Sequence, residues 1–192
     1  MQSALPLRPL LLAGLCLPLL GCGEAEERID VSLVNRQMSY DSTYLLEARE
    51  VEMHRTPYPG LSQADTAALL ARPDSYAEDA PFTARPVELA DKEAVRLVLI
   101  FNARAPMEAR DICALTQAMG RDAPLSKAGF TADVALCDGD RTLAVGSVKA
   151  EAPSPETRDA AFAKRALDKL IWSVFGNSAE RRAVDQRSLQ ID

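Results

Sequence analysis

The pattern of apolar and polar positions is clearest in the second half of the chain. Residues Val95–Phe101 are apolar and β-branched on nearly both faces, which predicts a strand in the middle of a sheet. Further on, apolar residues recur at helical spacing from Ala163 to Val174, after the typical helix start Ser154-Pro155-Glu156. Gly176 follows as a candidate C-cap. This pattern predicts a long C-terminal helix over residues 155–175.

Between these two elements, alternating apolar residues predict a β-hairpin over residues 130–150. Asp138-Gly139 is a strong signal for a two-residue type I′ turn. With this turn, Val134 pairs with Leu143. The apolar side chains of both strands, Val145 included, then lie on one face, because side chains alternate along a strand.

The first half of the chain is patterned less regularly. Alternation over residues 29–33 predicts a half-buried strand, while residues 44–53 fit a strand or a helix, of which we favour the strand. Ser62 begins an N-cap pattern with Asp65 at the third helical position, which predicts a short helix that ends before proline 73. Residues 73–90 contain three prolines among acids and predict a long connecting loop.

Residues 102–129 contain several prolines and glycines and are predicted to be irregular, apart from one helical turn near residues 107–114. Together these elements predict an α+β domain with a mostly antiparallel sheet. Its β-hairpin (130–150) packs against the long C-terminal helix (155–175) in two layers.

The N-terminus carries a different pattern. Residues 1–21 have the layout of a secretory signal, with Arg8 before an apolar run that ends at Leu20. This run is shorter than the ~20 apolar residues that a transmembrane helix needs. It ends in Leu19-Leu20-Gly21-Cys22, which resembles the lipobox of bacterial lipoproteins. The resemblance implies that residues 1–21 are a lipoprotein signal peptide and that Cys22 carries the lipid.

Other interpretations of the N-terminus are an ordinary secretory signal cut near Gly21 or Gly23, and an uncleaved anchor. Cys16 is a poorer candidate for lipidation, because Leu15 before it is too large for the peptidase pocket that a lipobox implies. By the same resemblance, Gly23 in place of an aspartate implies the outer membrane, and the protein is expected there, lipid-anchored on the periplasmic side.

The lipobox interpretation divides the chain after the signal peptide into a tether, a folded domain and a tail. Residues 22–28 would form a short lipid-proximal tether, in which the six residues 23–28 span at most ~20 Å. Residues 29–175 would form a single periplasmic α+β domain, and residues 176–192 a charged tail that is flexible. The expected partners are the lipid bilayer, through acylated Cys22, and an unidentified envelope protein.

Composition argues against nucleic acid as a partner. The chain has 22 basic and 28 acidic residues, a net charge of −6. Removal of residues 1–21, which contain one base and no acid, makes the net charge −7. Binding to nucleic acid requires clustered Lys and Arg that release counterions, and the sequence contains no such cluster.

Two cysteines remain once Cys16 leaves with the signal and Cys22 takes the lipid. Cys113 and Cys137 are predicted to form a disulfide, because two cysteines in an oxidising compartment most simply pair. Free buried thiols are the main alternative. Metal or redox chemistry is disfavoured, because the two cysteines form no C-x-x-C motif and only one histidine is present.

Few other residues suggest chemistry, and we predict no cofactor and no metal site. His54 is the only histidine and the one candidate general base, but it lies in no recognisable catalytic motif and is more simply a surface or turn residue. Asp138-Gly139-Asp140 lacks the twelve-residue pattern of a calcium loop and fits a turn. Trp172 and Phe175 either complete the core or form a docking patch for a partner.

These observations favour a non-enzymatic lipoprotein that acts through protein contacts as a structural, assembly or accessory factor of the cell envelope. A hairpin followed by a C-terminal helix, residues 130–175, looks like the closing segment of several envelope accessory lipoproteins. The alternative is a periplasmic module that binds a small ligand between the helix and the sheet. A hydrolase that uses His54 is the third and weakest hypothesis.

Overall fold

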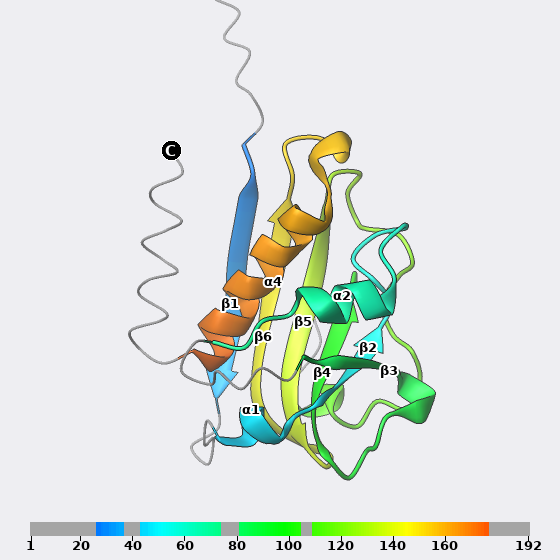
Figure 1. Cartoon of the computed structure of the whole chain (residues 1–192), viewed down its shortest axis with the longest axis vertical. Coiled ribbons are helices and arrows are strands. Elements are labelled where there is room, and N and C mark those ends of the chain that lie inside the picture. The colour runs from blue at the N-terminus through cyan, green and yellow to red at the C-terminus, as the bar shows by residue number, and fades with distance from the viewer. Residues whose placement is uncertain (1–25, 37–42, 74–80, 105–108, 177–192) are drawn as a thin grey trace, which may run out of the picture.

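The computed structural model describes residues 26–36, 43–73, 81–104 and 109–176. They form an α+β fold with a mostly antiparallel open sheet and a C-terminal helix, which confirms the predicted fold class (Figure 1). The predicted signal peptide 1–21, the lipidation site Cys22 and the tail from residue 177 lie outside the described residues.

The elements come in the following order along the chain. They are β1 (Arg28–Arg36), α1 (Thr43–Glu47), β2 (Glu50–His54), α2 (Gln63–Leu69), β3 (Thr83–Pro86), η2 (Val87–Leu89), β4 (Val95–Phe101), α3 (Ala109–Ile112), β5 (Gly129–Asp138), β6 (Arg141–Glu151), η3 (Pro155–Thr157) and α4 (Ala160–Phe175). In the described residues the strands form one six-stranded sheet in the order β1-β6-β5-β4-β2-β3. All neighbours are antiparallel except that β2 runs parallel to both β3 and β4.

Helices α1, α2 and α4 contribute to the core on one face of the sheet, with α4 lying across β6 and β1 (Figure 1). Alternate residues of β4 point to this side, where Leu97, Leu99 and Phe101 are buried. From α4, Phe162 and Leu170 are fully buried in the same core. The helical stripe predicted from Ala163 to Val174 therefore faces the sheet, as its spacing requires.

The C-terminal helix begins later than the sequence predicts. Ser154-Pro155-Glu156 starts only η3, a single 3₁₀ turn, and the backbone leaves the helical region at Arg158. Asp159 then acts as the N-cap of α4, with its carboxylate accepting the N–H of Phe162 at 2.8 Å. The predicted start at residue 155 is wrong because a second capping residue follows a few positions later.

The β5–β6 hairpin forms, but its turn differs from the prediction. Asp138 pairs with Arg141, so the turn residues are Gly139 and Asp140. Gly139 has φ +59°, whereas Asp140 has no positive φ, and a type I′ turn needs both. Glycine at the first central position fits a type II′ turn instead.

A bulge shifts the pairing further along the hairpin. The register changes between Leu136 and Cys137, so that Val134 lies opposite Gly146 and not opposite Leu143. Leu143 still packs in the core beneath α4, but Val145 lies on the opposite face. The prediction that Val145 shares a face with Val134 is wrong, because the bulge adds one residue to β6 and reverses the alternation.

In the first half, the predicted strand at residues 29–33 lies within β1, and the predicted helix after Ser62 is α2. Residues 44–53 are divided between α1 and β2, so our preference for a strand there is half right. Residues 73–90 contain β3 and η2, which we did not predict, and residues 74–80 lie outside the described residues. The helical turn predicted near residues 107–114 corresponds to α3.

The two capping residues should differ in their contribution to stability. We expect Asp159→Ala to lower the free energy of unfolding by about 1 kcal/mol, because it removes the acceptor at the N-terminus of a 16-residue helix. Ser154→Ala should lower the free energy of unfolding by less than Asp159→Ala does, since Ser154 caps only one 3₁₀ turn. Urea denaturation measures both, and a larger loss for Ser154→Ala would contradict the observed helix start.

Candidate functional site

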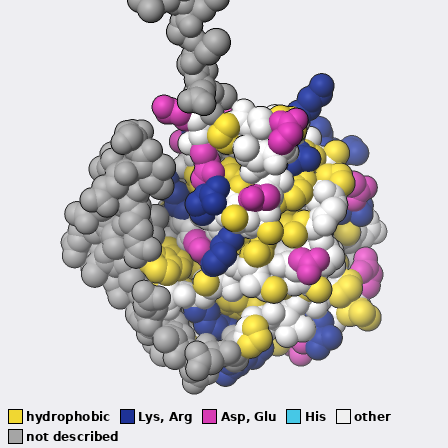
Figure 2. Space-filling model, turned by 45° about the horizontal axis from the view of Figure 1, so that its top comes forward, with side chains coloured by type: hydrophobic (Ala, Val, Ile, Leu, Met, Phe, Trp, Pro, Cys, Tyr) yellow, Lys and Arg dark blue, Asp and Glu magenta, His cyan; other side chains and the backbone are white. Residues whose placement is uncertain are grey.

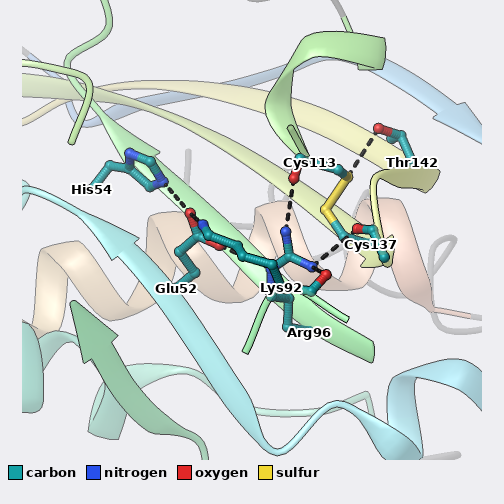
Figure 3. Close-up of a disulfide and its surroundings, with 8 residues drawn as sticks. Glu52, His54, Lys92, Arg96, Cys113, Cys137 and Thr142 are labelled. Carbon is teal, nitrogen blue, oxygen red and sulfur yellow. Dashed lines mark hydrogen bonds and ion pairs between the residues drawn. A yellow bond between two sulfur atoms is a disulfide. The ribbon is translucent and has the colours of Figure 1, made fainter. Parts of the chain in front are cut away.

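The face of the sheet opposite α4 carries a second, smaller core. Its members come from β4, β5, β6 and the segment that follows β4: Val98, Ile100, Ile112, Cys113, Ala135, Cys137 and Val145. Beside this core lie four charged or titratable side chains, Glu52, His54, Lys92 and Arg96, which we call the Glu52 cluster (Figure 3). Parallel pairing of β2 with β4 places Glu52 beside Val98 and His54 beside Ile100.

Glu52 is the centre of this cluster. Its side chain is fully buried, with 0% of its surface exposed. Oε1 lies 2.9 Å from Nε2 of His54 and 2.5 Å from Nζ of Lys92. Oε2 accepts a hydrogen bond of 2.9 Å from Nε of Arg96. Both carboxylate oxygens therefore have hydrogen-bonding partners. These partners offset the free-energy cost of burying the negative charge.

The environment determines the charge state of Glu52. Burial raises the pKa of its carboxyl group, but the hydrogen bonds from His54, Lys92 and Arg96 outweigh burial and lower the pKa to about 2. Glu52 is thus a carboxylate at neutral pH. It acts as the acceptor for three side chains from two strands and a loop.

Arg96 connects the cluster to two other parts of the chain, the β5–β6 turn and Cys113. It is 1% exposed, and Nη1 donates to the carbonyl oxygens of Lys92 at 2.8 Å and Gly139 at 3.0 Å. Nη2 donates to the carbonyl oxygen of Cys113 at 2.7 Å. One guanidinium therefore holds β2, the β5–β6 turn and the disulfide-bonded residue together, using the fixed fork of donors that lysine lacks.

The prediction that His54 is a surface or turn residue is wrong. It is the last residue of β2 and is 0% exposed. Its Nδ1 accepts the backbone N–H of Met119 at 3.0 Å, so that in the neutral ring Nε2 carries the proton and donates to Glu52. Both ring nitrogens are occupied, and a role as general base would require the segment around Met119 to move away.

The predicted pair Cys113–Cys137 forms a disulfide in the structure, with the Cα atoms 5.6 Å apart. Both residues are fully buried, and Sγ of Cys113 lies 3.0 Å from the hydroxyl oxygen of Thr142. The disulfide joins the start of the segment 113–122 to β5. Through Arg96, the same segment is also tied to the Glu52 cluster (Figure 3).

Backbone contacts and one ion pair hold the other end of this segment. Gly120 has φ +85°, and a Cβ atom there would overlap the carbonyl oxygen of Phe101. The same oxygen accepts the N–H of Arg121 at 3.3 Å, and Asp122 forms an ion pair of 3.2 Å with Arg55. Glycine is required at position 120, because any side chain would prevent this close approach.

The other candidate residues lie apart from the cluster. Phe175 is 1% exposed within the main core, and Trp172 is partly buried and packs against that core. Asp138-Gly139-Asp140 lies at the hairpin turn, where Asp138 pairs with Arg141 at 2.8 Å. Among the described residues, no group of three or more His, Cys, Asp or Glu side chains is arranged to hold a metal ion.

Three of the four members of the cluster were not predicted from the sequence: Glu52, Lys92 and Arg96. One signal was present, because Arg96 is a charge inside a strand that is otherwise apolar on both faces. A charge in such a position needs a buried partner of opposite sign. The sequence did not indicate which acid provides it, since Glu52 lies 44 residues away on a strand that we could not place.

The chain matches no protein-family model and has no significant match among curated proteins or solved structures. In the part of the chain that the structure describes, no helix has the length and apolarity to cross a membrane. The role of the Glu52 cluster is therefore inferred from its geometry. Glu52, His54 and Arg96 are buried and Lys92 is partly buried, and the bonds among them hold the second face of the sheet in one arrangement.

Arg96→Met should destabilise the domain strongly. We expect a loss of about 3–5 kcal/mol in the free energy of unfolding, because Glu52 would remain buried without one of its partners. Arg85→Met on β3 is the matched control. It removes a half-exposed pair with Glu50 at 2.6 Å and should cost less than about 1 kcal/mol. Guanidinium denaturation of both variants measures the difference, and equal losses would contradict a structural role for the cluster.

The lowered pKa of Glu52 also predicts a pH dependence. Because its pKa falls from 4.5 to about 2 on folding, its contribution to stability is complete above pH 4.5 and is lost as the pH falls through about 2. The shift corresponds to roughly 3 kcal/mol. Glu52→Gln should therefore show a shallower fall in unfolding free energy between these pH values than the wild type. A Glu50→Gln control should keep the wild-type slope, and the same slope in all three proteins would refute the assignment.

Proposed function

We propose that this protein is a lipid-anchored, non-enzymatic factor of the bacterial cell envelope that acts through contacts with another envelope protein. The observation that carries the proposal is Leu19-Leu20-Gly21-Cys22 at the end of a short apolar run. In this proposal Cys22 carries the acyl chains, residues 1–21 are removed, and the domain lies on the periplasmic side of the outer membrane. Two or three acyl chains are needed for stable anchoring, because one chain holds a protein only reversibly.

The disulfide supports export. Cys113 and Cys137 are paired and buried, and disulfides of this kind form and persist in oxidising compartments. They are rare in the cytosol, where thiols are kept reduced. A chain that has a secretory signal layout and a paired, buried cystine is consistent with folding outside the cytoplasm.

The state of His54 supports a non-enzymatic role over the hydrolase hypothesis. A general base must reach the proton that it removes, directly or through one water. His54 is fully buried, and its two nitrogens are bonded to Glu52 and to the backbone of Met119. The ring therefore serves as a link between β2 and the segment 113–122.

Packing of α4 on the sheet gives little support to the ligand-module alternative. The side chains at that interface are fully buried and contact one another, among them an edge-to-face pair of Phe130 and Phe162 with centroids 5.8 Å apart. The same packing supports our finer proposal for the fold, in which α4 is the long helix of a two-layer domain. A ligand would have to displace these side chains to bind there.

Cys22→Ser tests the anchor. We expect the variant to lose acylation and to move from the membrane fraction to the soluble periplasmic fraction when the full chain is expressed in a bacterium. Cys16→Ser is the matched control and should remain acylated and sediment with membranes. Mass spectrometry of the N-terminal peptide and membrane fractionation measure both effects. A Cys22→Ser protein that is still acylated would overturn the proposal.

Crosslinking in cells tests the second part of the proposal. We expect the acylated protein to form a specific crosslinked species with one envelope protein, which mass spectrometry identifies, and we expect Cys22→Ser to lower its yield. The Cys16→Ser protein serves as the control at equal expression. Recovery of no stable partner from the acylated protein would count against an accessory role.

A further inference from the structure

The chain between the lipidation site and the folded domain is short. Glu27 is already fixed, because its Oε1 accepts a hydrogen bond of 2.9 Å from Nε of Arg165 on α4. Five peptide steps therefore separate Cys22 from the first fixed residue, which span about 17 Å when fully extended. This inference rests on the proposed function, because it needs an acyl chain on Cys22.

Several elements begin or end where the tether joins the domain. Arg28, the first residue of β1, pairs with Glu151, the last residue of β6, and Gly129 at the start of β5 pairs with the same residue. Nearby, Arg158 donates from Nη1 to the carbonyl oxygen of Lys127 at 2.7 Å. We call this the β1-start end. At the opposite end lie the β5–β6 turn and the start of β4, since Val95 pairs with Asp138. We call it the turn end.

The distance between the two ends exceeds the reach of the tether. Strand β6 has 11 residues and runs from the turn end to the β1-start end. At about 3.4 Å per residue it is roughly 34 Å long, about twice the length of the extended tether. If the turn end lay on the bilayer, the start of β1 would lie farther from the surface than the tether can reach. An inverted orientation is therefore sterically excluded for an acylated chain.

Charge does not distinguish the two ends. The turn end exposes or half-exposes the acids Asp91, Glu93, Asp138 and Asp140, and Arg141 pairs with Asp138 there. At the β1-start end, acids and bases alternate, and they are interspersed with apolar side chains on the face that Figure 2 brings forward. Arg28 pairs there with Asp30, and Arg165 pairs with Glu27. Opposite charges are paired at both ends, so the orientation rests on the reach of the tether and not on charge.

We propose that the β1-start end of the domain faces the lipid headgroups and that the turn end points away from the membrane. The membrane-facing surface consists of residues 26–28, 126–129 and 151–159. The turn end, with the hairpin turn and the residues before β4, is then the part of the domain that extends farthest from the bilayer.

Energy transfer from single tryptophans to a dansyl-labelled headgroup tests this orientation. The native tryptophan is removed by Trp172→Phe, and one new tryptophan is placed at each end. Glu156→Trp lies in η3 at the β1-start end, and Glu93→Trp precedes β4 at the turn end. Both glutamates are exposed and each substitution removes one negative charge, so the two variants are matched in size, polarity and charge. The acylated proteins are reconstituted in vesicles of phosphatidylethanolamine and phosphatidylglycerol that contain the dansyl lipid.

We expect transfer to be severalfold more efficient from Glu156→Trp than from Glu93→Trp. Flotation of the same samples reports anchoring independently, and Cys22→Ser proteins give the background. If both variants float and transfer is equal or reversed, the orientation is wrong while the lipid anchor stands. If the unsubstituted protein does not float, both the anchor and the orientation are refuted. Equal urea midpoints for the two variants establish that neither substitution has unfolded the domain.

Discussion

The second face of the sheet depends on one buried ion pair, Glu52 with Arg96. The two residues come from neighbouring parallel strands, and each is bonded to further groups that would otherwise be buried without a partner. A buried ion pair contributes little by itself, because desolvation offsets its Coulombic energy. Its importance lies in the penalty for breaking it, since the remaining charge would be left in an apolar environment. This asymmetry makes one arrangement of β2, β4 and the segment 113–122 strongly preferred.

One disulfide and two hydrogen bonds hold that segment, and they act at two positions, Cys113 and Met119. The disulfide fixes Cys113 to β5, Arg96 fixes the carbonyl group of the same residue, and His54 fixes the backbone at Met119. The covalent bond limits how far the segment can separate from the sheet. The polar bonds determine how it is oriented there. A loop with little regular structure is thereby held to the strands beneath it at two positions.

The sequence predicted those features that depend on local patterns. Val95–Phe101 and the helix after Ser62 were identified correctly because apolar runs and capping residues act within a few positions. The hairpin was found, but the bulge near Leu136 reversed the face of Val145, and no local signal distinguishes such a bulge from a regular register. The disulfide followed from counting cysteines.

The Glu52 cluster could not be predicted in the same way. Its members lie on β2, on β4 and before β4, and they meet only because β2 and β4 are parallel neighbours. A parallel pair needs a crossover connection, and its partners are set by topology and not by spacing in the sequence. His54 was misassigned for this reason. Its position beside a proline-rich turn suggested the surface, whereas strand pairing buries it beside Ile100.

The bond between His54 and the backbone of Met119 has a consequence for sequence divergence. The imidazole accepts a main-chain N–H, and the thioether side chain of Met119 is partly exposed and takes no part in the bond. Every amino acid except proline supplies that donor. The side chain at position 119 can therefore differ in size, charge and polarity among homologous chains, and only proline would remove the hydrogen bond. This holds although the backbone at that position provides one of the two hydrogen-bond partners of a fully buried imidazole ring.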